Sequence, residues 1–220
     1  MLAPDLTFFQ LADLAAEGYV ITASQYRGTA GAAGHDEFGG EDVADVLSLL
    51  EVLPDMASVD GSRIGMIGHS RGGMMTYLAL TRTNRIRAAV VLAGPTDLAA
   101  GLNTRPEMMQ VYSQAFSHNG GELQAALESR SAVNLVARFP RSTPILIVHG
   151  TADWRVSPTD SLKIAELLLG EQIPFRLVML EGGDHGLSEY ELEVQSMIRD
   201  WFGRYLATGA ELPNMAPHGP

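Results

Sequence analysis

The chain has 220 residues, 46% of them hydrophobic and 19% charged, which suits one α/β domain with a full core and excludes a disordered or fibrous protein. A formal net charge of −11 argues against nucleic acid or an anionic membrane as the main binding partner. The absence of cysteine excludes disulfides, thiolate zinc sites and a cysteine nucleophile.

The N-terminal region gives an expectation about cellular location. No Lys or Arg precedes Arg27, and no apolar run approaches the length of a membrane span. We therefore expect neither a secretory signal nor a membrane anchor, and predict a cytoplasmic protein. A natural start upstream of Met1 would change this expectation.

Helix and strand patterns alternate in the first part of the chain. A helix begins at Asp5 and is ended by Gly18, and residues 19–23 form an apolar run typical of a buried strand. The glycine-rich stretch 28–40 lacks a dinucleotide-binding fingerprint, so we expect a mobile loop there. A second helix, 41–53, is closed by a proline.

The next segment carries the strongest signal. An apolar strand at 63–67 runs into Gly68-His69-Ser70-Arg71-Gly72, and a helix extends to Leu80. Gly-x-Ser-x-Gly at a strand-to-helix turn is the layout of a nucleophile elbow, where the positions two residues from the serine tolerate little bulk. Ser70 is the candidate nucleophile, and the backbone N–H of Arg71 is the candidate oxyanion donor.

The second half continues the alternation. Strands are expected at 86–93, 144–148 and 175–180, and a helix is expected from Ser157-Pro158 to Leu169. A final helix should begin with a capping box formed by Ser188 and Glu191. Because strands alternate with helices, we predict an α/β fold with a mostly parallel sheet flanked by helices.

Residues 97–142 interrupt this rhythm with helical stretches between two core strands. An insert at this point lies over the carboxyl ends of the strands, where open α/β sheets bind ligands. We expect a small helical cap that shapes an apolar pocket, with Met108, Met109 and Tyr112 as candidate substrate-binding residues. The alternative is that these side chains only pack the insert onto the body.

Three chemically distinct residues follow separate strands. Ser70, Asp153 and His185 occur in the chain order of nucleophile, acid and base found in α/β-hydrolases. His185 would take the proton of Ser70 and later deliver it to the leaving group. Asp153 would fix the imidazole tautomer and stabilise the imidazolium.

Other residues compete for these roles. Asp97 and Asp184 are alternative acids, although Asp184 directly precedes His185 and neighbours in a tight loop rarely face each other. His69 and His149 are expected to have structural roles. The remaining histidines, expected at the surface, are His35, His118 and His218. Trp154 either lines the substrate site or has only a packing role.

Five motifs together resemble a known family. They are Tyr26-Arg27-Gly28, the acidic and glycine-containing run 36–46, Gly68-His69-Ser70-Arg71-Gly72-Gly73, His149-Gly150-x-x-Asp153 with Val156, and Gly183-Asp184-His185-Gly186. This set is similar to the catalytic domain of prolyl oligopeptidase-type serine hydrolases, and the similarity extends to about Leu206. The resemblance implies an α/β-hydrolase domain over 1–206, with 207–220 as a tail, and implies that Ser70, Asp153 and His185 are its triad.

The resemblance leaves the substrate open between two groups. Peptidases of the family have an extra propeller domain, for which 220 residues have no room, so we favour an esterase or small acyl hydrolase. The alternatives are a serine peptidase acting on short peptides, and an inactive domain that only binds. No cofactor is expected, and a metal site at His35-Asp36-Glu37 or Asp184-His185 is disfavoured because adjacent residues rarely converge on one ion. A homo-oligomer remains open.

One departure concerns the start of the domain. Such domains normally begin with strands before the first helix, one of which ends in a loop that gives the second oxyanion donor. Those strands are missing from this sequence. The hydroxyl of Tyr26 or a backbone N–H near Leu2 is the candidate replacement.

Overall fold

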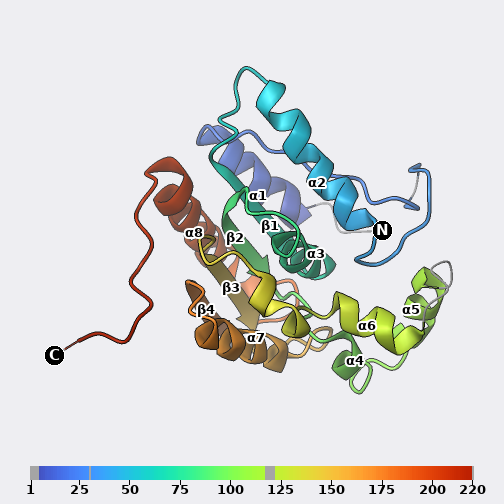
Figure 1. Ribbon diagram of the computed structural model, residues 1–220. Coiled ribbons are helices and arrows are strands. Elements are labelled where there is room, and N and C mark those ends of the chain that lie inside the picture. The colour runs from blue at the N-terminus through green and yellow to red at the C-terminus, as the bar shows by residue number, and fades with distance from the viewer. Residues whose placement is uncertain (1–4, 30, 117–121, 220) are drawn as a thin grey trace.

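A four-stranded parallel sheet forms the centre of the computed structural model, which describes residues 5–29, 31–116 and 122–219 (Figure 1). The strands are β1 Ile64–His69, β2 Ile86–Leu92, β3 Ile145–Gly150 and β4 Phe175–Leu180. Their order in the sheet is β1-β2-β3-β4, and all neighbours are parallel. The four carboxyl ends therefore meet at one edge, as the sequence predicts.

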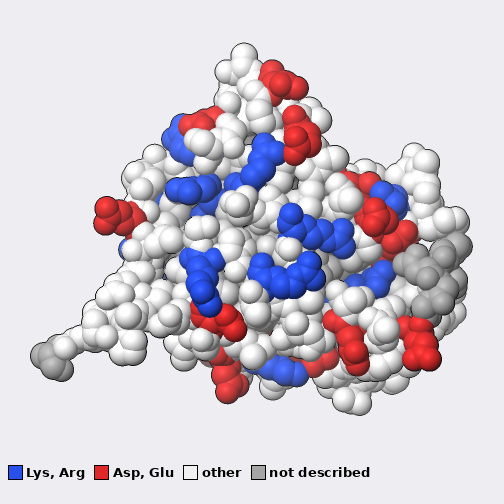
Figure 2. Space-filling view, viewed as in Figure 1, with Lys and Arg blue, Asp and Glu red and all other residues white. Residues whose placement is uncertain are grey.

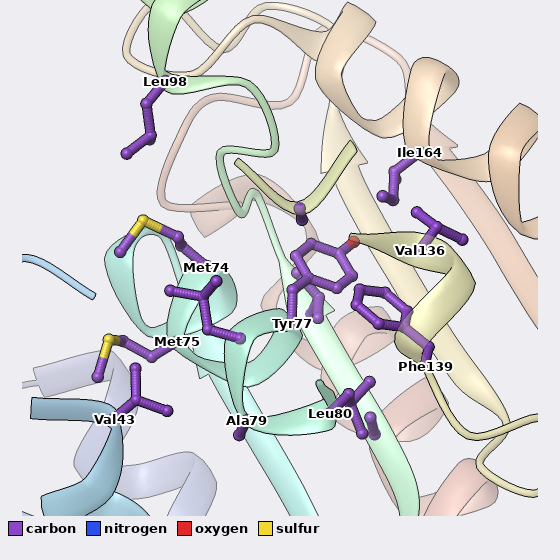
Figure 3. Close-up of a cluster of buried hydrophobic side chains, with 14 of the residues drawn as sticks. Val43, Met74, Met75, Tyr77, Ala79, Leu80, Leu98, Val136, Phe139 and Ile164 are labelled. Atoms are coloured by element: carbon purple, nitrogen blue, oxygen red, sulfur yellow. The ribbon is translucent and has the colours of Figure 1, made fainter. Parts of the chain in front are cut away.

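Helices cover both faces of this sheet. The main ones are α1 Asp5–Ala16, α2 Asp42–Val52, α3 Arg71–Leu80, α7 Pro158–Gly170 and α8 Glu191–Phe202. Ile145 of β3 packs in one apolar cluster with side chains of α3 and α7, whereas its neighbour Leu146 packs in a second cluster with side chains of α8. Figure 3 shows the first cluster, where Tyr77 of α3 stacks on Phe139.

The insert between β2 and β3 is helical, as expected. It contains α4 Leu98–Gly101, α5 Met108–Phe116, α6 Leu123–Arg130 and two short 3-10 turns, Ala132–Asn134 and Val136–Arg138. Figure 1 shows α4, α5 and α6 grouped at one end of the molecule. The chain after the π-helical turn Gly203–Ala207 has no helix or strand up to residue 219.

The strand predicted at 19–23 is wrong. Residues 19–26 form no helix or strand, and Val20 and Ile21 are 43% and 36% exposed. Within the described ranges β1 pairs only with β2, and no strand precedes β1. An apolar run without a neighbouring strand cannot pair its backbone groups, so this segment stays outside the sheet.

The capping box predicted at the last helix is also wrong. Leu187 has a left-handed backbone with φ of 55°, which turns the chain so that Ser188 begins a separate 3-10 turn, Ser188–Tyr190. Tyr190 then occupies the cap position of α8, and no side chain caps the helix.

Charge is unevenly distributed on the molecule. Figure 2 shows Lys and Arg side chains gathered across the middle of one face, although the net charge is −11. None of the described helices is long and apolar enough to cross a membrane.

Candidate active site

The turn at Ser70 joins β1 directly to α3. Ser70 has a φ of 56° and a ψ of −122°, a strained conformation for a residue with a side chain. A Cβ on Gly68 would lie 2.0 Å from the carbonyl oxygen of Gly72. Only glycine therefore fits at position 68, where the two backbone segments come close together. The Ser70 N–H donates to the Leu92 carbonyl at 2.8 Å, which fixes the elbow to the end of β2.

The three residues predicted to form the triad meet at the carboxyl edge of the sheet. Ser70 Oγ lies 2.8 Å from His185 Nε2, and His185 Nδ1 lies 2.7 Å from Asp153 Oδ2. Asp153 follows β3 and His185 follows β4, so adjacent parallel strands place the acid beside the base. The serine proton therefore has a direct path to an imidazole that a carboxylate orients.

The carboxylate of Asp153 is buried but well supplied with donors. Its Oδ1 accepts the N–H groups of Arg155 at 2.8 Å and Val156 at 3.0 Å. Burial alone would raise the pKa of Asp153, but hydrogen bonds from His149, His185 and the Val156 N–H more than offset it and hold this pKa far below the usual range. The group is ionised at neutral pH.

Asp97 and Asp184, the alternative candidates for the triad acid, bond to other groups. Asp97 accepts the Ala100 N–H at the start of α4 and pairs with Lys163 at 2.6 Å. The Asp184 carboxylate faces the backbone N–H of Ser188, at 3.4 Å. Neither is hydrogen-bonded to the His185 imidazole in the described part of the chain.

Two further histidines surround the triad. The imidazole of His69 reaches the His185 carbonyl oxygen, with Nε2 at 2.7 Å, and does not bond to Ser70. His149 is fully buried in β3, with Nδ1 2.6 Å from Ser161 Oγ and Nε2 3.1 Å from Asp153 Oδ2. The described residues hold no group of three or more His, Cys, Asp or Glu side chains able to bind a metal ion.

Arg71 links the elbow to the glycine-rich loop. Its guanidinium bonds to both carboxylate oxygens of Asp36 and to Asp42, and lies between the rings of Tyr26 and Phe38. These contacts hold Asp36 and Phe38, in the loop that the sequence predicts to be mobile, against Arg71. The guanidinium thus points into the loop, while the backbone N–H of Arg71 stands at the N-terminus of α3, where N–H groups have no intrahelical acceptor.

The candidates for a second oxyanion donor differ in position. The Tyr26 hydroxyl lies beside the elbow, 3.9 Å from the place that a Cβ on Gly72 would take. Burial raises the pKa of Tyr26, so the phenol keeps its proton at neutral pH and can donate it in a hydrogen bond. Leu2 lies outside the described residues.

A pocket opens beside Ser70 between the insert and the loop after β3. Of the candidate substrate-binding residues, Met108 and Tyr112 line it, whereas Met109 and Trp154 do not. Met109 is 41% exposed, and Trp154 is 71% exposed with Arg105 and Arg155 against its ring. The other apolar walls of the pocket are Phe38, Pro95, Leu98 and Val156.

The model of the prolyl oligopeptidase family matches residues 5–209, most of the chain. The chain belongs to the prolyl oligopeptidase family.

Individual relatives match this chain over different lengths. Uncharacterized peptidase YtmA of Bacillus subtilis is 27% identical over 160 residues, which make up 72% of this chain and 62% of that protein. The acylamino-acid-releasing enzyme of Mus musculus is 25% identical over 215 residues, 87% of this chain and 28% of that enzyme. The chain thus spans less than two thirds of one relative and less than one third of the other.

Solved structures agree with the fold. A Mycobacterium tuberculosis puromycin-hydrolyzing peptidase matches with a TM-score of 0.67 at 25% identity, over 80% of this chain and 26% of that one. A Pyrococcus horikoshii acylaminoacyl peptidase matches with a TM-score of 0.68 at 22% identity, over 78% and 29% of the two chains. The predicted α/β-hydrolase fold is thereby confirmed.

The sequence gives several polar residues at this prolyl oligopeptidase-family site no role in the site. Arg105, Arg155 and Asp160 line the pocket, and Asp36 and Asp42 hold Arg71. Asp160 lies in the first turn of the helix after the acid-bearing strand, close to the edge where ligands bind. This position in the chain is the only sequence feature that indicates Asp160 as a site residue.

Proposed function

We propose that this chain is the catalytic unit of a serine peptidase that cleaves peptide bonds through an acyl-enzyme. The observation that carries the proposal is the continuous hydrogen-bond chain from Ser70 through His185 to Asp153. The relatives are named as peptidases and acylamino-acid-releasing enzymes, which favours the peptidase alternative over the esterase that the chain length suggests. Residues 1–206 would form this unit, with 207–220 as a tail.

In the first half of the reaction, Ser70 Oγ attacks the carbonyl carbon of the scissile bond while its proton passes to His185 Nε2. Asp153 stabilises the imidazolium that results. The negative charge on the carbonyl oxygen is stabilised by the Arg71 N–H and, in this proposal, by the Tyr26 hydroxyl. His185 then gives the proton to the leaving amine, and the C–N bond breaks to leave an acyl-Ser70 ester.

In the second half, water replaces the amine. His185 takes one proton from the water as its oxygen attacks the ester carbonyl, and returns that proton to Ser70 Oγ as the acyl group leaves. The products are a free carboxylic acid and the parent enzyme, so no cofactor is consumed.

The pocket supports a substrate with an apolar side chain next to the scissile bond. Met108, Tyr112 and Leu98 form a wall of the insert beside Ser70, and Tyr112 is stabilised by stacking on Phe116. Burial of an apolar side chain against such a wall is favourable in proportion to the area removed from water. We therefore propose short peptides with an apolar residue on the acyl side of the cleaved bond.

Hydrolysis of a short peptide anilide with an apolar residue before the anilide tests this proposal. The parent protein should release the amine, and Ser70→Ala should lower the rate by about 10³-fold or more. Equal rates for the folded parent and Ser70→Ala would contradict the proposal. No hydrolysis by a folded parent would favour the alternative of an inactive domain that binds.

A further inference from the structure

The carboxylate of Asp153 has a second imidazole on its triad-facing oxygen. His149 Nε2 lies 3.1 Å from Asp153 Oδ2, the same atom that lies 2.7 Å from His185 Nδ1. His149 is fully buried and belongs to β3, four residues before the carboxylate. The rigid strand therefore places one histidine behind the acid and the loop after β4 places the other in front of it.

The partners of His149 define where its proton lies. Its Nε2 faces two oxygens that can only accept, the Asp153 carboxylate and the Val156 carbonyl at 3.2 Å, so this nitrogen carries a hydrogen. Its Nδ1 lies 2.6 Å from Ser161 Oγ, and a hydroxyl can donate there. A proton from Ser161 gives the neutral Nε2–H tautomer. His185 has the opposite requirement, because it presents Nδ1–H to the acid and a bare Nε2 to Ser70.

We propose that His149, with its tautomer fixed by Ser161, is a positioning residue that holds Asp153 Oδ2 where it orients His185. This inference rests on the proposed serine peptidase function. It extends the triad to a chain of five side chains, Ser161, His149, Asp153, His185 and Ser70, in which only the last two touch the substrate.

The loop around Asp153 is also held by hydrogen bonds other than those from His149 Nε2 to Asp153 Oδ2 and the Val156 carbonyl. Oδ1 of Asp153 accepts the Arg155 and Val156 N–H groups, and the Asp153 N–H donates to the Gly150 carbonyl at 3.3 Å. These three bonds do not involve His149. Loss of the His149 N–H leaves Oδ2 with His185 as its remaining described donor, so the effect falls on the orientation and charge of the base.

Loss of the His149 N–H should shift the pH dependence of catalysis in one direction. A carboxylate with one donor fewer stabilises a positive charge on His185 more strongly, so the inactive imidazolium persists to higher pH. The acidic limb of the kcat/KM profile therefore moves to higher pH when His149 loses its N–H. The other charged or titratable groups around this network are His69 from β1, Arg155 in the same loop and Asp160 from α7, and they are unchanged by the substitution.

Two substitutions of His149 separate positioning from packing. Glutamine carries an amide N–H that can replace Nε2–H, whereas leucine fills space without a donor. We expect His149→Leu to lower kcat by about tenfold or more with little change in KM, and to move the acidic limb upward. We expect His149→Gln to stay within about threefold of the parent, with the parent's pH profile. His218→Gln, in the exposed tail, is the matched control.

Ser161→Ala tests the tautomer with a smaller change to the core. It removes the hydroxyl that donates to Nδ1 and keeps the imidazole, so kcat should fall between those of the two His149 variants. If His149→Leu and His149→Gln are folded and share one kcat and one pH profile, the inference is wrong. A parent that does not hydrolyse peptides overturns the proposed function instead, so the two failures are distinguishable.

A spectroscopic readout does not depend on activity. Long-range 1H–15N NMR of protein labelled in its six histidines reports the tautomer of each ring, and His149→Gln identifies the signal of His149. We expect a neutral ring protonated at Nε2, and a shift of that signal in Ser161→Ala. A ring protonated at Nδ1 overturns the inference.

Discussion

Arg71 and Asp36 form a two-pronged ion pair, with Nη1 2.5 Å from Oδ2 and Nη2 2.5 Å from Oδ1. The pair connects the residue after Ser70 with a loop 35 positions earlier in the chain. Nη2 also bonds to the fully buried carboxylate of Asp42 at 2.7 Å. One guanidinium therefore holds the glycine-rich loop, the start of α2 and the elbow together.

Loss of this guanidinium should destabilise the fold. Arg71→Ala leaves the buried Asp42 carboxylate without its cation, and we expect the free energy of unfolding to fall by about 2–3 kcal/mol, less than for a fully buried pair because Arg71 is partly exposed. Urea unfolding measures it. Arg63→Ala removes an exposed ion pair with Asp60 and should have a much smaller effect. Equal losses in the two variants would contradict the role given to Arg71.

Because Asp36 is paired with Arg71, we expect the protein to lose stability in acid. Burial alone would raise the pKa of Asp36, but hydrogen bonds from Arg71 and the Phe38 N–H lower it below the ordinary 3.8. A carboxyl with a lowered pKa in the folded state stabilises the protein above its unfolded pKa and loses this contribution as the pH falls through the folded value. Unfolding free energies should therefore decrease below about pH 4, and less steeply in Asp36→Asn. Urea titrations at several pH values test this, and identical slopes would contradict it.

The sequence predicts all four strands and the meeting of Ser70, Asp153 and His185, because those features depend on local patterns and on the rule that parallel strands end at one edge. The strand expected at 19–23 fails for a physical reason. An apolar run reveals a preference for burial, but not whether another strand lies beside it.

The features that the sequence does not predict depend on contacts and backbone angles that no local pattern indicates. Asp36 and Arg71 are 35 positions apart, and no local pattern pairs them. The pairing of His149 with Asp153 depends on the turn after β3, which places an i,i+4 pair face to face outside a helix. The failed capping box at Ser188 reflects one left-handed residue, Leu187, whose φ the sequence does not indicate.

The elbow should not tolerate a side chain at Gly68. In Gly68→Ala the new Cβ would lie 2.0 Å from the Gly72 carbonyl oxygen, a backbone atom that cannot move without opening the turn. We expect a loss of about 3 kcal/mol in unfolding free energy, together with loss of activity. Gly203→Ala is the control, since nothing lies within 4 Å of its new Cβ. An active, stable Gly68→Ala protein would rule out this description of the turn.

The Tyr26 hydroxyl should contribute to catalysis. Tyr26→Phe keeps the ring that lies against the Arg71 guanidinium but removes the donor. If this hydroxyl completes the oxyanion hole, kcat for the peptide anilide should fall about 100-fold with KM little changed. The thermal midpoint serves as the check on folding. A folded variant with the parent's kcat would show that Tyr26 is not the second donor.

Two adjacent methionines offer a matched test of the pocket. Met108 lines the pocket beside Ser70, whereas Met109 is 41% exposed and does not line it. Met108→Ala should reduce the ratio of kcat/KM for a peptide with a large apolar residue to that for its alanine counterpart, by about tenfold. Met109→Ala should leave this ratio unchanged. The same change in both variants would show that this pocket does not determine substrate specificity.

Covalent labelling by a fluorophosphonate tests the central claim most directly, because the reagent requires a serine activated by its histidine and does not depend on the choice of peptide. Intact-protein and peptide mass spectrometry of the labelled parent should show one adduct per chain on Ser70, lost in Ser70→Ala and strongly slowed in a variant of His185. A folded parent that takes up no label, or that is labelled at a residue other than Ser70, would contradict the assignment of Ser70 as the nucleophile.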